Sequence, residues 1–145
     1  MSIPKTAKDL YHRKFIPIDD ERTFSIFDSL ETKNNITRPF YILLVTQILE
    51  NADGALSEAA GVRCRSFIEN YPNYLLEFLF LNKKPIKIEF VNRWANQVSM
   101  EFSIDCENDC RNCASKSYER AKRNCNAKDL ENLKYIYSII KNNCP

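Results

Sequence analysis

The residues of this sequence that could do chemistry are its cysteines. Four of the six lie within the 21 residues 105–125, and two stand apart, at Cys64 and Cys144. The clustered four are Cys106, Cys110, Cys113 and Cys125. Thiolates at such spacing can hold zinc or an iron–sulfur cluster, and thiols can also pair as disulfides. The choice among these three decides the compartment in which the protein works.

The metal interpretations both meet an obstacle. The spacing Cys106-x3-Cys110-x2-Cys113 matches the cluster-binding pattern of radical S-adenosylmethionine enzymes. That motif opens a long barrel, however, and only 32 residues follow Cys113 here. A structural zinc ion needs four ligands. If residues 114–124 form a helix, Cys125 lies about 18 Å from Cys113, which is too far to share one ion. We therefore expect no metal ligands, and zinc stays as an alternative.

Disulfide bonds are the favoured interpretation. Six cysteines make an even count and are dense for a reduced cytosolic protein. Helices over 107–124 and 127–143 would run antiparallel because only two residues link them. That arrangement returns Cys144 to the cluster, where it would pair with Cys106, Cys110 or Cys113. The remaining cluster members would pair with each other, as Cys106 with Cys113, or with Cys64.

Two cysteines are open to another interpretation. Cys64 lies on an apolar helix face, where a buried free thiol is common. If Cys64 is free, one other cysteine is unpaired too, because the total is even.

The disulfides predict a periplasmic or secreted protein, with a cytoplasmic location as the alternative. The N-terminus shows no hydrophobic signal core, so the sequence reads as cytoplasmic or as a mature form.

No catalytic constellation accompanies the cysteines. Nucleophilic cysteine chemistry needs an activating base, and the single histidine, His12, lies in a weakly patterned N-terminal stretch. With two glycines in the chain, there is no G-x-G-x-x-G motif and no P-loop. The acidic run 19–21 is typical of a helix first turn. We expect no catalytic residue, no bound cofactor and no enzymatic activity.

The charge distribution argues against nucleic acid and membranes as partners. The net charge is +2, which is close to neutral. Residues 111–145 carry eight Lys and Arg against three Asp and Glu, a net of +5, but few aromatic residues stand among them. This basic stretch is typical of a solvated helix face. No apolar run reaches the roughly 20 residues that span a bilayer.

Hydrophobic periodicity predicts an all-α protein. The expected helices cover residues 8–14, 19–31, 37–54, 55–72, 73–81, 85–104, 114–124 and 126–143, joined by short loops. Thr37 and Asn126 are the expected N-caps of two of them. We expect residues 1–145 to form a single domain, with 1–18 as a loosely ordered N-terminal arm. Its architecture would be an irregular helical bundle or a short array of antiparallel helix pairs, stapled by disulfides.

Two of the expected helices have clear apolar faces. The face of helix 55–72 comprises Leu56, Ala60, Cys64, Phe67, Ile68 and Tyr71. The stripe of helix 85–104 recurs every four residues and comprises Ile86, Phe90, Trp94, Val98 and Phe102, with Val91 beside it. Residues 86–90 also alternate like a strand, but the longer pattern favours helix. These faces should form much of the core.

Two resemblances bear on function. Six cysteines in a helical chain, with the Cys106/Cys110 pair, resemble insect odorant-binding proteins, but Cys113 follows too soon and one cysteine alone precedes the pair. The stretches "TRPFY" and "DGALSE", within residues 37–72, resemble a segment of small uncharacterised helical proteins from Bacteroidetes-type bacteria, which are often exported. This second resemblance implies no catalytic residue, and it implies an exported helical protein, of which periplasmic immunity proteins are one class.

Three functional hypotheses follow. The first is a non-enzymatic helical protein that binds another protein, such as a periplasmic immunity or inhibitor protein. The second is a carrier of a small apolar ligand, held in a cavity among the helices that Phe78, Phe80, Phe90 and Trp94 would line. The third is a cysteine-ligated zinc protein.

Overall fold

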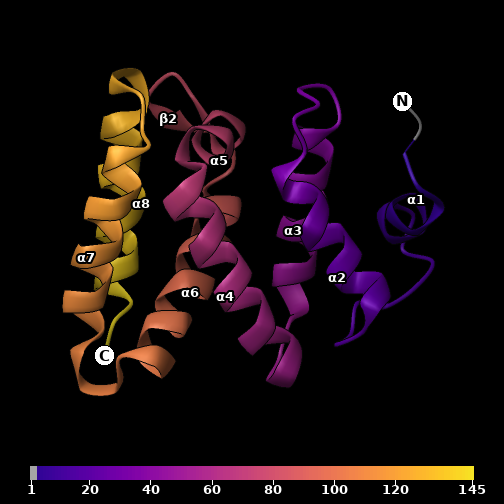
Figure 1. The fold of residues 1–145 in the computed structure, drawn as a ribbon, viewed down its shortest axis with the longest axis horizontal. Helices are drawn as coiled ribbons and strands as arrows, with labels where there is room; N and C mark the ends of the chain where they lie inside the picture. The colour runs from indigo at the N-terminus through magenta and orange to yellow at the C-terminus, as the bar shows by residue number, and fades with distance from the viewer. Residues whose placement is uncertain (1–2) are drawn as a thin grey trace. The chain divides into compact units, whose positions relative to one another are not determined.

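The computed structural model describes residues 3–145 and is all-α, which confirms the predicted fold class. The described chain contains eight α-helices, three short 3-10 turns and one two-stranded hairpin. The helices are α1 (Lys5–Tyr11), α2 (Glu21–Asp28), α3 (Arg38–Asn51), α4 (Gly54–Asn70), α5 (Pro72–Leu79), α6 (Ile88–Asp105), α7 (Cys110–Arg123) and α8 (Leu130–Asn142) (Figure 1). None of the described helices is both long enough and apolar enough to cross a membrane.

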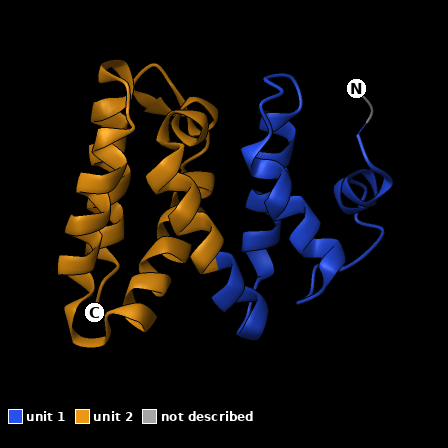
Figure 2. Ribbon diagram, viewed as in Figure 1, with its two compact units in different colours: residues 1–60 blue, residues 61–145 orange. Residues whose placement is uncertain are grey.

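The described chain divides into two compact units (Figure 2). The first ends at Ala60 and the second runs from Gly61 to Pro145, so the boundary falls inside α4. The expectation of one domain over 1–145 stays a prediction. The expected arm at 1–18 starts with residues that lie outside the described chain, and from Lys5 it forms helix α1, whose Ala7 and Leu10 are buried.

The first unit is built on α3, which is buried nearly all round, as its continuous apolar sequence predicts. Its buried residues include Ile42, Leu44, Val45, Thr46 and Ile48. Within the acidic run 19–21, Asp20 is the N-cap of α2, and its carboxylate accepts a hydrogen bond from the Thr23 amide at 2.9 Å. This hydrogen bond is also the main reason that the pKa of Asp20 is lowered.

Helix boundaries near α3 differ from the prediction. Thr37 is the N-cap residue of α3, but its side chain makes no capping hydrogen bond. Instead, the Asn34 side chain accepts from the amides of Ile36 and Thr37. Helix α3 ends at Asn51, and Gly54, at φ +52°, opens α4 where the sequence predicted the end of α3. A left-handed glycine can therefore start the next helix as well as stop the last one.

The second unit packs α6, α7 and α8 against each other, with α7 and α8 as an antiparallel hairpin (Figure 1). Helix α7 has the expected solvated face, and it also has a buried face, of which Ala114, Ser117 and Ala121 are part. Trp94 is fully buried in α6, and its ring lies 6.0 Å from that of Phe67. Tyr71, the last residue of the face predicted for helix 55–72, lies just beyond α4 and is exposed.

A short hairpin replaces the expected start of α6. Strand β1 (Phe80–Leu81) pairs antiparallel with β2 (Lys84–Pro85), and α6 begins only at Ile88. Ile86, the first residue of the predicted stripe, precedes the helix and is 59% exposed. The turn contains Asn82 at φ +58°, a conformation that asparagine tolerates better than most residues. This turn therefore forms without glycine.

Candidate functional site

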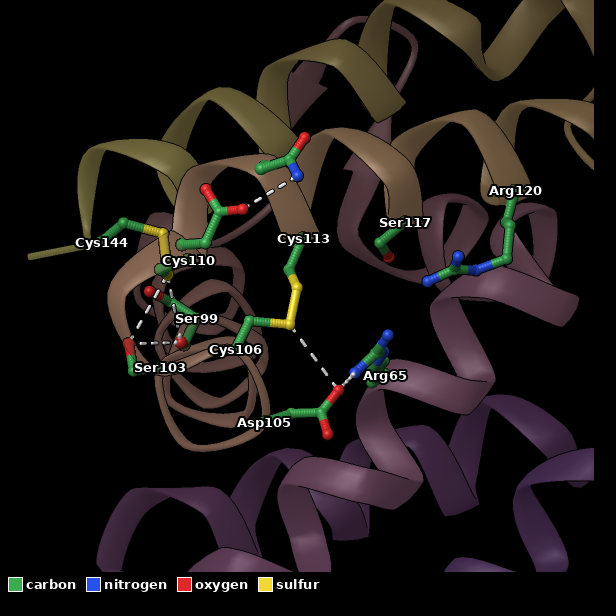
Figure 3. Close-up of a disulfide and its surroundings, with 12 residues drawn as sticks. Arg65, Ser99, Ser103, Asp105, Cys106, Cys110, Cys113, Ser117, Arg120 and Cys144 are labelled. Atoms are coloured by element: carbon green, nitrogen blue, oxygen red, sulfur yellow. Dashed lines mark hydrogen bonds and ion pairs between the residues drawn. A yellow bond between two sulfur atoms is a disulfide. The ribbon is translucent and has the colours of Figure 1, made fainter.

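Two disulfides fasten the start of α7 to its neighbours (Figure 3). Cys106, which follows α6, is bonded to Cys113 in the first turn of α7. Cys110, the first residue of α7, is bonded to Cys144, which lies just beyond α8. The structure thus pairs Cys144 with one of its three expected partners and closes the base of the α7/α8 hairpin. Both bonds lie at the same end of the second unit, which we call the stapled end.

The two remaining cysteines are not bonded. Cys64 is buried in α4, and Cys125 is half-buried after α7. The pairing of Cys106, Cys110, Cys113 and Cys144 leaves two thiols, whereas a structural zinc site needs four ligands. Within residues 3–145, no three His, Cys, Asp or Glu side chains gather where they could hold a metal ion. The disulfides are typical of an oxidising, non-cytoplasmic compartment.

Thiol labelling should separate the six cysteines into three classes. Burial raises the pKa of the Cys64 thiol, and burial together with the nearby charge of Asp129 raises that of Cys125 to about 11. Because the thiolate is the reactive form, we expect the native protein to react slowly with iodoacetamide at neutral pH. In denaturant without reductant, mass spectrometry should show two alkylated cysteines, and six after reduction. Alkylation of Cys144 before reduction would contradict the Cys110–Cys144 disulfide at the base of the α7/α8 hairpin.

Midway along α7, a largely buried carboxylate, that of Glu69, links α4 to α7 and, through Ser117, to α8. Glu69 on α4 accepts from Arg120 Nε at 3.1 Å and from Ser117 Oγ at 2.9 Å, both on α7. Ser117 gives its one proton to Glu69, so the Tyr137 hydroxyl of α8, 2.7 Å away, donates to Ser117. Burial raises the pKa of the Tyr137 phenol, so Tyr137 stays a neutral donor. The network satisfies its buried polar groups internally, and we interpret it as structural.

We expect Glu69→Gln to lower the free energy of unfolding by about 2 kcal/mol, because hydrogen bonds to a charged group contribute about 1.5–3 kcal/mol each. The amide keeps the size of the side chain but removes the charge that faces Arg120. Chemical denaturation measures the change. The matched control is Glu119→Gln, an exposed carboxylate on α7, which should change stability by less than about 0.5 kcal/mol. Equal effects from both variants would show that the network adds no stability.

An apolar groove lies beside the disulfides, on α6 and the chain after α8. Its volume is about 460 Å³, and we call it the stapled groove. Its lining residues are Asn96, Ser99, Met100, Ser103, Ile104, Asn143 and Pro145. Met100 and Ile104 stand one helical turn apart and are 47% and 55% exposed. The Asn143 amide donates to Asn96 Oδ1 at 2.6 Å and ties the two sides of the groove together.

The four aromatic residues expected to line one ligand cavity do not share one: Phe80 lines a cavity at the β1–β2 turn, and the described cavities include none of the other three in their lining. Trp94 and Phe80 are buried, and the rings of Phe78 and Phe90 stack on each other with centroids 6.3 Å apart. Met100 and Ile104 were not predicted as candidate site residues. The signal was present, since both interrupt the otherwise polar face of α6 that lies opposite the buried stripe.

Comparison with known proteins gives no relative for this chain: no protein-family model, no curated protein and no solved structure matches it.

Proposed function

We propose that this protein is a non-enzymatic binding protein that docks another protein on the stapled groove, in the periplasm or outside the cell. The observation that supports this most is the pair of exposed apolar side chains, Met100 and Ile104, at the groove. Apolar side chains clustered at a hollow on a folded surface are typical of protein-binding sites. Methionine suits such surfaces because its thioether is flexible and polarizable.

Rigidity of the groove supports the same proposal. The Cys110–Cys144 bond lies directly beside it, and Ser103 Oγ, which belongs to the groove, is 3.5 Å from Cys110 Sγ (Figure 3). A surface that is ordered before binding loses less conformational entropy when a partner docks, so affinity rises without additional contacts. Small periplasmic immunity and inhibitor proteins are a class that works in this way, and we place this protein with them by analogy.

The test compares partner capture by three forms of the protein. Wild type, Met100→Glu/Ile104→Glu and the control Ile88→Glu are used as baits for periplasmic and secreted proteins of the source organism. Ile88 lies on the same helix, is 42% exposed and is absent from the groove lining. A protein identified by mass spectrometry is then purified and titrated against each form. We expect at least tenfold weaker binding for the groove variant alone. Equal affinity for all three forms would rule out the groove.

A small apolar-ligand carrier is the second candidate, and one observation favours it. The first unit contains a cavity of about 180 Å³, lined by Leu10, Phe15, Ile16 and Ile48 among others. Native mass spectrometry of the purified protein separates the two candidates. A copurifying apolar molecule would support the carrier, whereas retention of a protein partner that Met100→Glu/Ile104→Glu releases would support the binding protein.

A further inference from the structure

A second hollow of the second unit lies at the β1–β2 hairpin. Figure 1 shows strand β2 at the end of this unit opposite the C-terminus. Its volume is about 360 Å³, and we call it the hairpin cavity. It is formed by the end of α5, the β1–β2 turn, the 3-10 turn Ala127–Asp129 and the start of α8. Phe80 supplies an apolar wall, and the Asn132 amide donates to the Asn82 carbonyl at 2.9 Å, which fixes the turn against α8.

Four charged side chains line this cavity, Glu77 and Asp129 against Lys83 and Lys128. Glu77 is paired with Lys128 at 3.2 Å, and Lys83 is paired with Glu131 at 3.0 Å. Each of these exposed pairs is neutral in sum. Asp129, which also lines the cavity, has no salt bridge in the described structure. Of the four charged residues that line the described cavity, Asp129 alone therefore has no ion-pair partner.

The Asp129 carboxylate also lacks hydrogen-bond donors. The residue is 7% exposed, and its Oδ2 is buried without a partner. Although Asp129 occupies the N-cap position of α8, its side chain makes no capping hydrogen bond. Burial raises the pKa of Asp129, the repulsion of Glu77 adds to this, and Lys128 opposes both. A buried carboxylate that accepts no hydrogen bond destabilises the folded protein. A ligand that brings both N–H donors and a positive charge would remove this cost, and it would bind for that reason.

We propose that the hairpin cavity binds an organic cation, an ammonium or guanidinium group, whose N–H groups donate to the Asp129 carboxylate. The Phe80 side of the cavity receives the aliphatic carbons that carry the cation. Arginine and lysine side chains of a partner have this chemistry, and so do free amines. The site is separate from the stapled groove, so its failure would leave the proposed function untouched.

Titrations followed by two-dimensional ¹⁵N–¹H NMR test the site with two probes of nearly equal shape. N-acetyl-L-argininamide carries the guanidinium, and N-acetyl-L-citrullinamide carries a neutral urea in its place. We expect millimolar binding of the argininamide, with shifts concentrated on residues 77–83 and 127–132. We expect binding of the citrullinamide at least tenfold weaker, because charge-assisted hydrogen bonds are the stronger kind.

Two variants assign the effect to the carboxylate. Asp129→Asn removes the charge and should weaken argininamide binding at least tenfold, whereas Glu119→Gln, an exposed carboxylate on α7, should not change it. Because Asp129 makes no hydrogen bond to lose, Asp129→Asn should unfold at the same denaturant concentration as wild type or a higher one. Equal response to both probes, shifts outside the cavity, or unchanged affinity of Asp129→Asn would each overturn the proposal.

A last comparison identifies the source of the cation. Agmatine represents a free amine, and a short peptide with a central arginine represents a partner's side chain. Tighter binding of the peptide would indicate a protein partner, and tighter binding of agmatine a free small molecule. Either result supports a cation site, whereas failure of both to bind would overturn it.

Discussion

Trp94→Ala should lower the free energy of unfolding by about 3–5 kcal/mol, the usual cost of removing a buried aromatic side chain. The indole is fully buried on α6 and contacts the ring of Phe67 on α4. Alanine leaves a cavity between two helices of the second unit, and the surrounding side chains can fill it only in part. Chemical denaturation followed by circular dichroism measures the loss, because the variant no longer has tryptophan fluorescence.

Two further variants serve as controls, one for the volume of the side chain and one for its burial. Trp94→Phe keeps much of the apolar volume and should lose clearly less stability than Trp94→Ala. Tyr135→Ala removes an aromatic side chain that is 42% exposed on α8, and it should cost well under half as much. If Trp94→Ala unfolds at the same denaturant concentration as wild type, the indole is at the surface and the described core is incorrect.

Removal of the Cys110–Cys144 bond should have an effect of similar size. The bond joins residues 34 positions apart, and in the chain-entropy model such a cross-link contributes about 3–4 kcal/mol by restricting the unfolded chain. Cys110→Ala/Cys144→Ala should lower the free energy of unfolding by this amount. Both cysteines are buried, so alanine is the replacement of choice because it places no polar group in the core. Urea denaturation without reductant measures the change.

The second disulfide is the internal control for that experiment. Cys106 and Cys113 are only seven positions apart, so their bond should contribute about 2 kcal/mol in the same model. The variant Cys106→Ala/Cys113→Ala should therefore be the more stable of the two. If the short cross-link proves the more important one, loop entropy does not explain the stabilisation by these bonds.

The helix positions and the disulfide-linked α7/α8 hairpin could be predicted from the sequence because both follow from short-range patterns. The stripe Trp94, Val98 and Phe102 is periodic, and the lengths of α7 and α8 bring Cys144 back to Cys110. The β1–β2 hairpin could not be predicted in the same way. Its two strands have two residues each, and Asn82 takes the conformation that glycine usually supplies.

The candidate sites depend on contacts that no local pattern contains. Glu69 and Arg120 are 51 positions apart, and Asn82 and Asn132 are 50 apart. A charged residue on a helix reads as solvated until the facing helix is known, which is why Glu69 gave no signal. Asp129 likewise looks like an ordinary helix cap, and only the structure shows that its carboxylate caps nothing.

The order of the bonded cysteines along the chain has a consequence for biosynthesis. The two disulfides interleave, since Cys110 lies between Cys106 and Cys113 while its partner is Cys144. The six thiols of the chain allow fifteen complete pairings, and an oxidant that acts on thiols as they emerge from the exporting machinery would meet Cys64, Cys106 and Cys110 before Cys113. Any bond among those first three is incorrect and must be exchanged through a mixed disulfide. We therefore expect the yield of correctly paired protein in an expression host to depend on its disulfide isomerase more than on its oxidising power.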